Sequence, residues 1–485
     1  MNIIVQVQVT ELTDLVECAL QTINIHKSPG PDDIPNWLLK DMAPLLANPI
    51  CAIFNASIQQ RSVPTIWKLA NIIPVPKIHP PTSIQTDLCP ISLTLTLCKI
   101  LELFVGRWLL QRIGAKLDPF QFGALRGRST SHALVSIIDQ WARALDGGES
   151  VRAVFVDFTK AFDRMDHTLL LNKMLTLGAP VFLVEWMFSF QKGRHHRVKI
   201  DGRISEWREP TAGMPQGTWL GPLSFIILIN DLKTSCPTHK FVDDVTLTEI
   251  LPSTTMPSAM QHFLSELHLW SSSNFMQINH YKTKEITLGP LARRDLDPLV
   301  VGGNNIERVF TFKLLGVHID SDLRWNTHID ALAKRVNSRL YTLKQLKRSG
   351  LPEQDLLIFY VTVIRPVIEY ANVVWHHSIT VAQSDRLEAL QKRAMRIISQ
   401  LAWDMPYSIA LQFLNLDSLL IRRVKQGVKF FDSICQTESC LNHLLPSKRD
   451  TQLTSRLRHP RIYPTPITRT HCYCSFINYA LTNYQ

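Results

Sequence analysis

The chain has 485 residues, 45% of them hydrophobic and 19% charged, and its formal net charge is +11. This length and apolar content predict a globular protein of about two to four domains. The nine cysteines are too irregularly spaced for a disulfide framework, no signal peptide opens the sequence, and the longest apolar run, Leu223–Ile229, cannot span a bilayer. We therefore expect an intracellular, soluble protein with no membrane partner. Composition leaves nucleus or cytoplasm, and the oligomeric state, open.

An amphipathic helix is expected to begin near Thr10, because apolar residues recur there at helical spacing. These residues are Leu12, Leu15, Val16, Ala19 and Leu20. The helix should end before the proline- and glycine-containing turn Lys27–Asp33. Four prolines then predict an irregular basic segment around Lys77, namely Pro74, Pro76, Pro80 and Pro81. A second helix is expected over Leu93–Leu110.

The middle of the chain mixes strand and helix patterns, which favours an α+β fold. The elements expected in order are a strand over Val151–Asp157, a helix over Asp166–Leu177, a basic hairpin over Arg194–Trp207 turning at Asp201-Gly202, a loop over Gly213–Gly221 feeding a helix through Leu232, and two short strands over Phe241–Leu247.

Beyond Trp325 the pattern becomes helical and basic. One apolar stripe consists of Leu332, Val336, Leu340 and Leu343, and another helix is expected over Asp385–Gln400. From Ala331 onward, 21 Lys and Arg stand against 10 Asp and Glu, so this segment carries the whole net positive charge. Such asymmetry favours a surface that faces a polyanion, with a merely solvated basic face as the alternative. The tail after about Leu441 is expected to be poorly ordered.

Three carboxylates interrupt apolar, β-branched runs. Asp157 closes Val154–Val156, and the pair Asp243 and Asp244 divides Phe241–Leu247. Buried neighbouring carboxylates repel one another and would be neutralised unless a cation were present. Oxygen ligands on rigid strands suit Mg²⁺ with substrate phosphates. The alternatives are a solvated turn for the pair and a strand-end cap for Asp157.

The order of the motifs is more specific than any one of them. Eight occur in sequence: Lys27–Asp32, Pro90–Leu93, Gln121–Gly123, Phe155–Asp163, Gly213–Leu223, Phe241–Asp244, Asn279–Thr283 and Leu315–Val317. From about residue 20 to 400 the chain resembles the reverse transcriptases of non-LTR retrotransposons of the LINE and jockey-like group. The resemblance implies a right-hand polymerase whose antiparallel palm sheet is backed by helices. It also implies an RNA template, a DNA primer and deoxynucleoside triphosphates as partners.

The resemblance predicts subdomain boundaries along the chain. These are an N-terminal helical extension and start of the fingers over 1–60, fingers and palm over 61–325, a helical basic thumb over 326–400, and a helical then poorly ordered basic tail over 401–485. Because the chain begins just before the fingers and shows no ribonuclease H pattern, we expect a fragment without an endonuclease domain, such as a truncated or decaying copy.

The resemblance also assigns catalytic roles. Asp157 and Asp243 match the two aspartates that would bridge two Mg²⁺ ions, with Mn²⁺ as a substitute, and Asp244 matches a third, weaker metal-site position. Lys282 matches a lysine that would protonate the pyrophosphate leaving group.

Nucleotide contacts are expected from Phe158, Phe162, Gln216, Gly217 and Lys77. Phe162 matches an aromatic steric gate against a ribose 2′-hydroxyl; the alternative is an ordinary core ring. Glycine at 217 lets backbone approach closely, and the Gln216 amide can donate to phosphate or sugar oxygens; the alternative is a plain turn. Lys77 is as well explained as a surface cation.

Nucleic-acid contacts are expected from Arg126 and Arg194, from the primer-grip positions Leu315 and Gly316, and from the basic thumb. The thumb residues are Arg335, Arg339, Lys344 and Lys347. Arg126 is as well explained as a surface cation.

Three departures from the family pattern weaken the match. Cys89 stands where the family has an arginine that would contact the triphosphate, Phe241 replaces a usual tyrosine, and Asp33 replaces a common glycine. Cys89 keeps open a second hypothesis, a nucleic-acid-binding remnant that does not polymerise. A nuclease is a third hypothesis, but it would leave the nucleotide loop and the gate unexplained.

Overall fold

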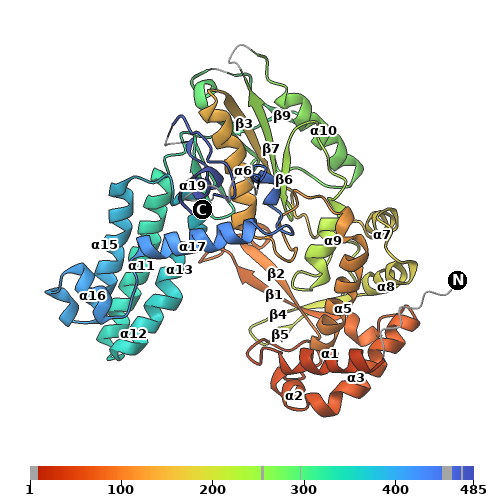
Figure 1. Cartoon of the computed structure of the whole chain (residues 1–485). Helices are drawn as coiled ribbons and strands as arrows, with labels where there is room; N and C mark the ends of the chain where they lie inside the picture. The colour runs from red at the N-terminus through yellow and green to blue at the C-terminus, as the bar shows by residue number, and fades with distance from the viewer. Residues whose placement is uncertain (1–8, 253–255, 295, 451–460, 471–472, 485) are drawn as a thin grey trace. The chain divides into compact units, whose positions relative to one another are not determined.

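The computed structural model describes residues 9–252, 256–294, 296–450, 461–470 and 473–484 and has mixed α+β structure (Figure 1). The chain forms two compact units that alternate along the sequence. Unit 1 comprises Met1–Ala124, Phe158–Lys233 and Leu269–Ile278, and unit 2 comprises Leu125–Asp157, Thr234–His268 and Asn279–Gln485. The predicted subdomain boundaries, which run in chain order, stay a prediction.

Unit 1 contains most of the N-terminal helices and a four-stranded sheet in the order β2-β1-β4-β5. Its helices are α1 (Val9–Gln21), α2 (Asn36–Asp41), α3 (Ala43–Gln59), α4 (Ile84–Asp87), α5 (Thr96–Ile113), α7 (His167–Thr176), α8 (Val181–Gln191) and α9 (Leu220–Leu228), with 3-10 turns η1 (Thr65–Lys68) and η2 (Gly114–Lys116). Its strands are β1 (Leu69–Pro76), β2 (Leu88–Thr94), β4 (His195–Ile200) and β5 (Arg203–Ile204).

The predicted helix near Thr10 is confirmed as α1, which buries Leu12, Val16 and Leu20. The hairpin turn at Asp201-Gly202 is confirmed as well, since both residues have positive φ and join β4 to β5.

The expectation of an irregular segment around Lys77 was wrong for the residues before it, because β1 carries two prolines within a regular strand. Pro74 and Pro76 pair with β2, while β4 pairs with β1 only over Leu69–Ile72. The prolines therefore lie where β1 has one neighbour instead of two, so no second ladder needs their missing N–H. The predicted helix over Leu93–Leu110 begins later, at Thr96, because Leu93 and Thr94 belong to β2.

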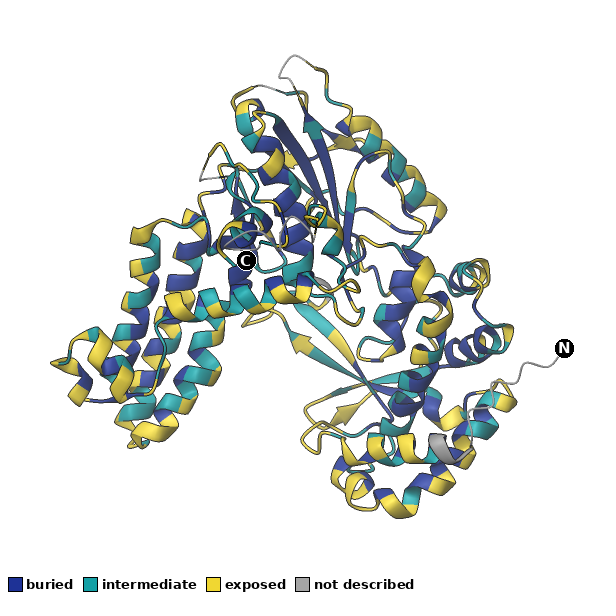
Figure 2. Ribbon diagram, in the orientation of Figure 1, coloured by how far each residue is buried: buried dark blue, intermediate teal, exposed yellow. Residues whose placement is uncertain are grey.

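Unit 2 is built on a five-stranded sheet in the order β11-β8-β3-β7-β6. The strands are β3 (Ser150–Val156), β6 (Thr238–Phe241), β7 (Asp244–Leu251), β8 (Lys284–Leu288) and β11 (Glu307–Arg308), followed by the hairpin β12 (Thr311–Leu314) and β13 (Val317–Asp320) and the small pair β9 (Val300–Val301) and β10 (Asn304–Asn305). Every residue of β3 is buried (Figure 2). Helix α6 (Thr130–Asp146) packs against β3 and β6 (Figure 1).

The helices of the C-terminal part are mostly amphipathic. They are α11 (Asn326–Arg348), α12 (Glu353–Phe359), the π-helical η4 (Tyr360–Ile364), α13 (Arg365–Glu369), α14 (Asn372–Trp375), α15 (Val381–Ile398), α16 (Tyr407–Phe413), α17 (Leu419–Ile434) and α19 (Phe476–Asn483). Shorter 3-10 turns are η3 (Gly289–Arg293), η5 (Leu401–Trp403) and η6 (Asn442–Leu444), and α10 (Met260–Ser273) runs from unit 2 into unit 1. Both predicted basic helices are confirmed, as α11 and α15.

The expectation of a poorly ordered tail after Leu441 was wrong for its last part. Helix α19 buries Phe476, Ile477 and Leu481 and packs on α6, α14 and α17. This helix is only eight residues long, and the proline- and threonine-rich segment before it dominated the prediction. Part of the same prediction, over residues 451–460, lies outside the described residues.

One segment, Glu353–Trp375, is long and apolar enough to cross a membrane by length and composition. It comprises α12, η4, α13 and α14 and is not a single straight helix, because Ala371 has positive φ. Tyr360, Ile364 and Trp375 are buried within unit 2, as in a core helix.

Candidate active site

The three aspartates meet at one end of the unit 2 sheet. Strand β3 pairs antiparallel with β7, and the last pair is Val156 with Val245. One step further, Asp157 comes opposite Asp244, and directly opposed residues of an antiparallel pair share one face. Strands β6 and β7 form a tight hairpin, with Phe241 paired to Asp244 and Val242 in the left-handed region. The predicted division of Phe241–Leu247 into two strands is thus confirmed, and Asp243 lies in the turn.

Burial perturbs all three carboxylates, and repulsion by a neighbouring carboxylate adds to the pKa shifts of Asp243 and Asp244. Burial raises the pKa of Asp157, and the nearby Lys282 ammonium opposes that rise. Burial raises the pKa of Asp243, and Asp157 adds to the rise. The pKa of Asp244 rises to about 6, through burial first and then the charges of Asp243 and Asp157, although part of its side chain stays exposed. Asp157 therefore lies close enough to both neighbouring carboxyls for its charge to raise their pKa values.

Residues after Asn279 close around Asp157. The Asn279 N–H donates to the Asp157 carbonyl at 2.8 Å, and the Asp157 N–H donates to Thr283 Oγ1 at 3.3 Å. Lys282 Nζ lies 3.8 Å from Asp157 Oδ2 and is well exposed. The structure thus brings the predicted proton donor next to the predicted first metal ligand. The contact of Thr283 with the Asp157 backbone was not predicted from the sequence, because a threonine after a lysine carries no recognisable signal.

The chemistry of these side chains fits a divalent cation. Asp157 Oδ2 is shielded from water and accepts no hydrogen bond, with Lys282 Nζ 3.8 Å away, and all three carboxylates have raised pKa values, chiefly because they are buried. Among the described residues, however, no three His, Cys, Asp or Glu side chains gather closely enough to hold a metal ion. A metal site at these aspartates is therefore proposed and not observed.

Asp244 predicts an unusual dependence of stability on pH. Its pKa is about 6 in the folded chain against an ordinary value of 3.8, so the folded state binds more protons between these values. The contribution of Asp244 to the free energy of unfolding of the metal-free chain should therefore rise as pH falls through this window. Asp244→Asn should be more stable than wild type above pH 6, and the difference should vanish below pH 3.8.

Urea unfolding in a chelator, at pH values across this window, measures the effect. The exposed Asp404→Asn serves as the matched control and should follow the wild type at every pH. A wild type and an Asp244→Asn variant of equal stability above pH 6 would contradict the expectation.

The loop over Gly213–Trp219 in unit 1 is tied down by backbone contacts. The N–H of Gly213 donates to the Met165 carbonyl and that of Met214 to the Phe162 carbonyl, each at 3.0 Å. The Ser92 N–H donates to the Gln216 carbonyl at 2.7 Å. Gln216 Nε2 donates to Asp163 Oδ1 at 3.2 Å.

Glycine is needed at 217 for two reasons. Its φ is +113°, and a Cβ there would lie 3.0 Å from the Ser92 carbonyl oxygen. Gly217 is exposed and Gln216 half-buried, so both remain accessible to a ligand.

The two phenylalanines of unit 1 that are predicted to contact the nucleotide differ in how far they are buried. Phe162 is half-buried, with its ring 5.2 Å from that of Phe225, so part of the ring faces outward as a gate would require. Phe158 is buried, with its ring 6.3 Å from that of Trp270, so its side chain packs within unit 1, and the nucleotide contact predicted for this residue stays a prediction. Lys77 is exposed just beyond β1, and its N–H donates to the Asp87 carbonyl at 2.7 Å.

Cys89 lies in β2 beside the same loop. Its thiol donates to Gln216 Oε1 at 3.5 Å. A longer cationic side chain at position 89 would begin next to Gln216, which is predicted to contact the nucleotide. The departure from the family pattern therefore lies beside the loop that carries Gln216 and Gly217.

The predicted primer-grip residues form a hairpin turn in unit 2. Leu315 and Gly316 both have positive φ and join β12 to β13. The Tyr370 hydroxyl donates to the Leu315 carbonyl at 2.8 Å, a contact that the sequence did not reveal. The ring of Phe312 stacks on that of Phe155, with centroids 4.0 Å apart, so the hairpin packs directly on the strand that carries Asp157.

The residues predicted to contact nucleic acid differ in how far they are buried. Arg194 is buried, with its guanidinium 4.6 Å from the Phe190 ring centroid, and the nucleic-acid contact predicted for it stays a prediction. Burial lowers the pKa of Arg194, the nearby Cys98 and Glu102 oppose that shift, and Arg194 Nη1 donates to the Phe190 carbonyl at 3.1 Å. Arg126 is exposed in the turn before α6.

On α11, Arg335 and Lys344 are exposed, whereas Arg339 and Lys347 are half-buried. Arg339 donates to the Val363 carbonyl, and Lys347 donates to the Ile398 carbonyl. The exposed pair therefore suits phosphate contacts better than the other two.

Comparison with known proteins adds to this geometry. Residues 78–319 match the family described as reverse transcriptase (RNA-dependent DNA polymerase). The chain is 27% identical over 459 residues to the probable RNA-directed DNA polymerase from transposon BS of Drosophila melanogaster, covering 90% of this chain and 50% of that protein. It is 27% identical to the X-element protein of the same fly, covering 92% and 50%, and 26% identical to its mobile element jockey protein, covering 80% and 44%. The chain thus spans about half the length of these relatives.

Among solved structures, telomerase from Candida albicans aligns with a TM-score of 0.37 and 13% identity, over 85% of this chain and 70% of that one. The telomerase of Candida tropicalis aligns with a TM-score of 0.36 and 12% identity, over 57% and 59%. Both TM-scores lie below 0.5.

Proposed function

We propose that this chain, which belongs to the reverse transcriptase family of non-LTR retrotransposons, is an RNA-directed DNA polymerase that extends a DNA primer on an RNA template. Its substrates are deoxynucleoside triphosphates, and its fold is a right hand with the unit 2 sheet as the palm. The observation that carries the proposal is the proximity of Asp157, Asp243 and Asp244 at one sheet end, where Asp157 raises the pKa of both other carboxyls and Asp243 raises that of Asp244.

The residues of this chain have separate tasks. Two Mg²⁺ ions, or Mn²⁺ in their place, held by the three aspartates would activate the primer 3′-hydroxyl and stabilise the leaving pyrophosphate. Lys282, whose Nζ is 3.8 Å from Asp157, donates a proton to the leaving group. In unit 1, Phe162 excludes the ribose 2′-hydroxyl, and Gln216 and Gly217 orient the nucleotide.

The remaining contacts hold the two strands. Leu315 and Gly316 support the primer end, and Arg126, Arg335 and Lys344 neutralise phosphates without reading sequence. A contact of this kind suits an enzyme that copies any template.

A second candidate function is a nucleic-acid-binding remnant that keeps the fold without polymerising. The observation that favours it is Cys89, since a thiol cannot supply the bidentate, charge-assisted phosphate contact of an arginine.

Primer extension by the purified chain on a homopolymer RNA separates the two candidates. A polymerase extends the primer with Mg²⁺ and deoxynucleotides, whereas a remnant binds the duplex and leaves its length unchanged. Duplex binding without extension under any metal condition would reject the first proposal.

Cys89→Arg is expected to lower the KM for deoxynucleotides about tenfold, because it adds a charged donor near Gln216. Steady-state primer extension over a range of nucleotide concentrations measures it. Cys89→Ser is the matched control, which replaces the thiol without adding charge and should keep the wild-type KM. An arginine variant no better than the serine variant would show that position 89 does not face the triphosphate.

A further inference from the structure

Glu102 is a fully buried carboxylate in the middle of α5. Its Oε2 accepts the N–H of Trp219 at 2.9 Å and the N–H of Leu220 at 3.2 Å, and its Oε1 accepts the Cys98 thiol at 3.6 Å. Trp219 and Leu220 stand at the start of α9, where free N–H groups need acceptors and the helix dipole favours an anion. A buried carboxylate is costly unless it is bonded in this way.

Gly106 lies one helical turn beyond Glu102 on the same face of α5. A Cβ built at Gly106 would lie 1.7 Å from an atom of the Trp219 ring. The indole therefore occupies the space that any side chain at position 106 would need. Glu102 holds the backbone at Trp219, and Gly106 admits its ring.

These contacts anchor the C-terminal end of the loop that carries Gln216 and Gly217. Its N-terminal end is bonded to Phe162 and Met165, as described above. Between the two ends, the Ser92 N–H holds the Gln216 carbonyl at 2.7 Å. A shift at Trp219 would reach Gly217 after only two residues.

We propose that Glu102 and Gly106 form a seat on α5 that positions Gln216 and Gly217 for the incoming nucleotide. Both are positioning residues, because they act through Trp219 and the backbone of the loop. The inference rests on the proposed nucleotide contact of that loop and names two residues that support it.

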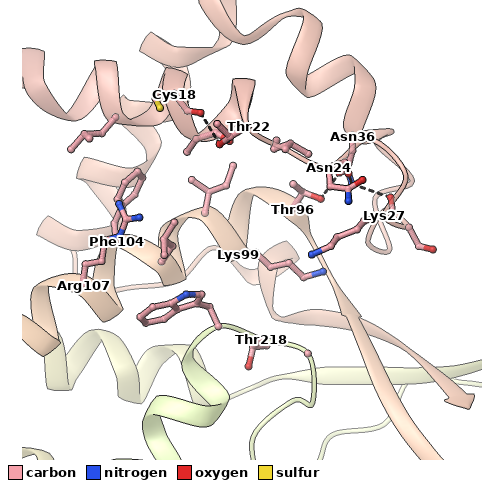
Figure 3. A pocket seen from close by; sticks show the side chains of 18 residues that line it. Cys18, Thr22, Asn24, Lys27, Asn36, Thr96, Lys99, Phe104, Arg107 and Thr218 are labelled. Atoms are coloured by element: carbon pink, nitrogen blue, oxygen red, sulfur yellow. Dashed lines mark hydrogen bonds between the residues drawn. The ribbon is translucent and has the colours of Figure 1, made fainter. Parts of the chain in front are cut away.

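A cavity of about 560 Å³ adjoins this seat. It lies within unit 1, and its lining includes Trp219, Thr218, Lys99 and Phe104 (Figure 3). Because Trp219 already borders this space, a bulkier residue at position 106 can push the indole into it without unfolding α5. A substitution at Gly106 is therefore expected to displace the loop in a folded protein.

The test compares Glu102→Gln, Gly106→Ala and the matched control Gly114→Ala in the full chain. Gly114 follows α5 directly, and a Cβ there meets no atom within 4 Å. Two measurements that need no turnover are made on each variant. They are hydrogen exchange of the Trp219 and Leu220 amides, and the equilibrium Kd of a deoxynucleoside triphosphate on a primer–template complex.

The Glu102→Gln and Gly106→Ala variants are expected to exchange these amides at least about tenfold faster and to bind the nucleotide about tenfold more weakly. Their melting temperature and primer–template affinity should stay near those of Gly114→Ala. Adding Trp219→Ala to Gly106→Ala removes the clashing ring and should restore much of the nucleotide affinity, an outcome that general destabilisation would not produce.

Unchanged amide exchange would overturn the seat, and faster exchange with unchanged nucleotide affinity would overturn its positioning role. Failure of the wild type to extend primers is a separate result. It would reject the proposed polymerase, while the exchange and binding measurements would still decide on Glu102 and Gly106.

Discussion

Asp243→Asn is expected to lower primer extension by about a thousandfold while leaving the fold intact. The substitution keeps the size of the side chain but removes one negative charge from a group of three. Loss of metal stabilisation at the reacting phosphate costs several kcal/mol, and each 1.4 kcal/mol or so is a tenfold change in rate. Asp243 lies in a turn between β6 and β7 and belongs to no strand, so the sheet does not depend on it.

Single-turnover extension on a preformed RNA–DNA duplex measures this effect, with duplex binding followed in parallel. Asp404→Asn is the matched control, because it makes the same chemical change at an exposed position in unit 2. If Asp243→Asn extended primers at a rate within a few fold of the control, Asp243 would not be a metal ligand of this chain.

Phe162→Val is expected to weaken discrimination against ribonucleotides by about a hundredfold, the scale on which a pocket rejects an added hydroxyl. The Phe162 ring is braced by Phe225 on one side and is not fully enclosed, so shortening it opens space beneath a bound sugar. The ratio of kcat/KM for a deoxynucleotide and its ribonucleotide counterpart is the quantity to measure.

Phe188→Val is the control for this change, since Phe188 is an exposed ring on α8 of the same unit. A rise in ribonucleotide use in both variants would point to a loosened protein and away from a specific gate. A Phe162→Val enzyme with wild-type sugar selectivity would contradict the role of Phe162.

Most of the helices and strands could be predicted from the residues, because apolar spacing and turn residues act within one segment of the chain. Alternating and helical apolar spacing predicted β3, α7, α11 and α15, and Asp201-Gly202 predicted the β4–β5 turn. The predictions that failed depended on partners elsewhere in the chain. Pro74 is compatible with a strand only because β4 stops short of it, and α19 is ordered because α6, α14 and α17 receive its apolar face.

For the candidate site, too, some residues could be identified from the sequence, whereas other properties were known only from the structure. Residue type and motif order were enough to single out Asp157, Asp243, Asp244 and Lys282, because a carboxylate inside an apolar strand is costly and therefore conspicuous. The burial of Arg194 and Phe158 could not be predicted from the sequence, because it depends on the elements that pack around them.

The sequence by itself determined the family of this chain and the acidic residues on which the proposed chemistry depends, since both are carried by short, ordered motifs. Only the tertiary structure decided which side chains support those motifs. The contacts of Glu102 with Trp219 and of Tyr370 with Leu315 join residues separated by 117 and 55 positions. Such contacts arise when distant elements pack together, so spacing within one segment could not reveal them.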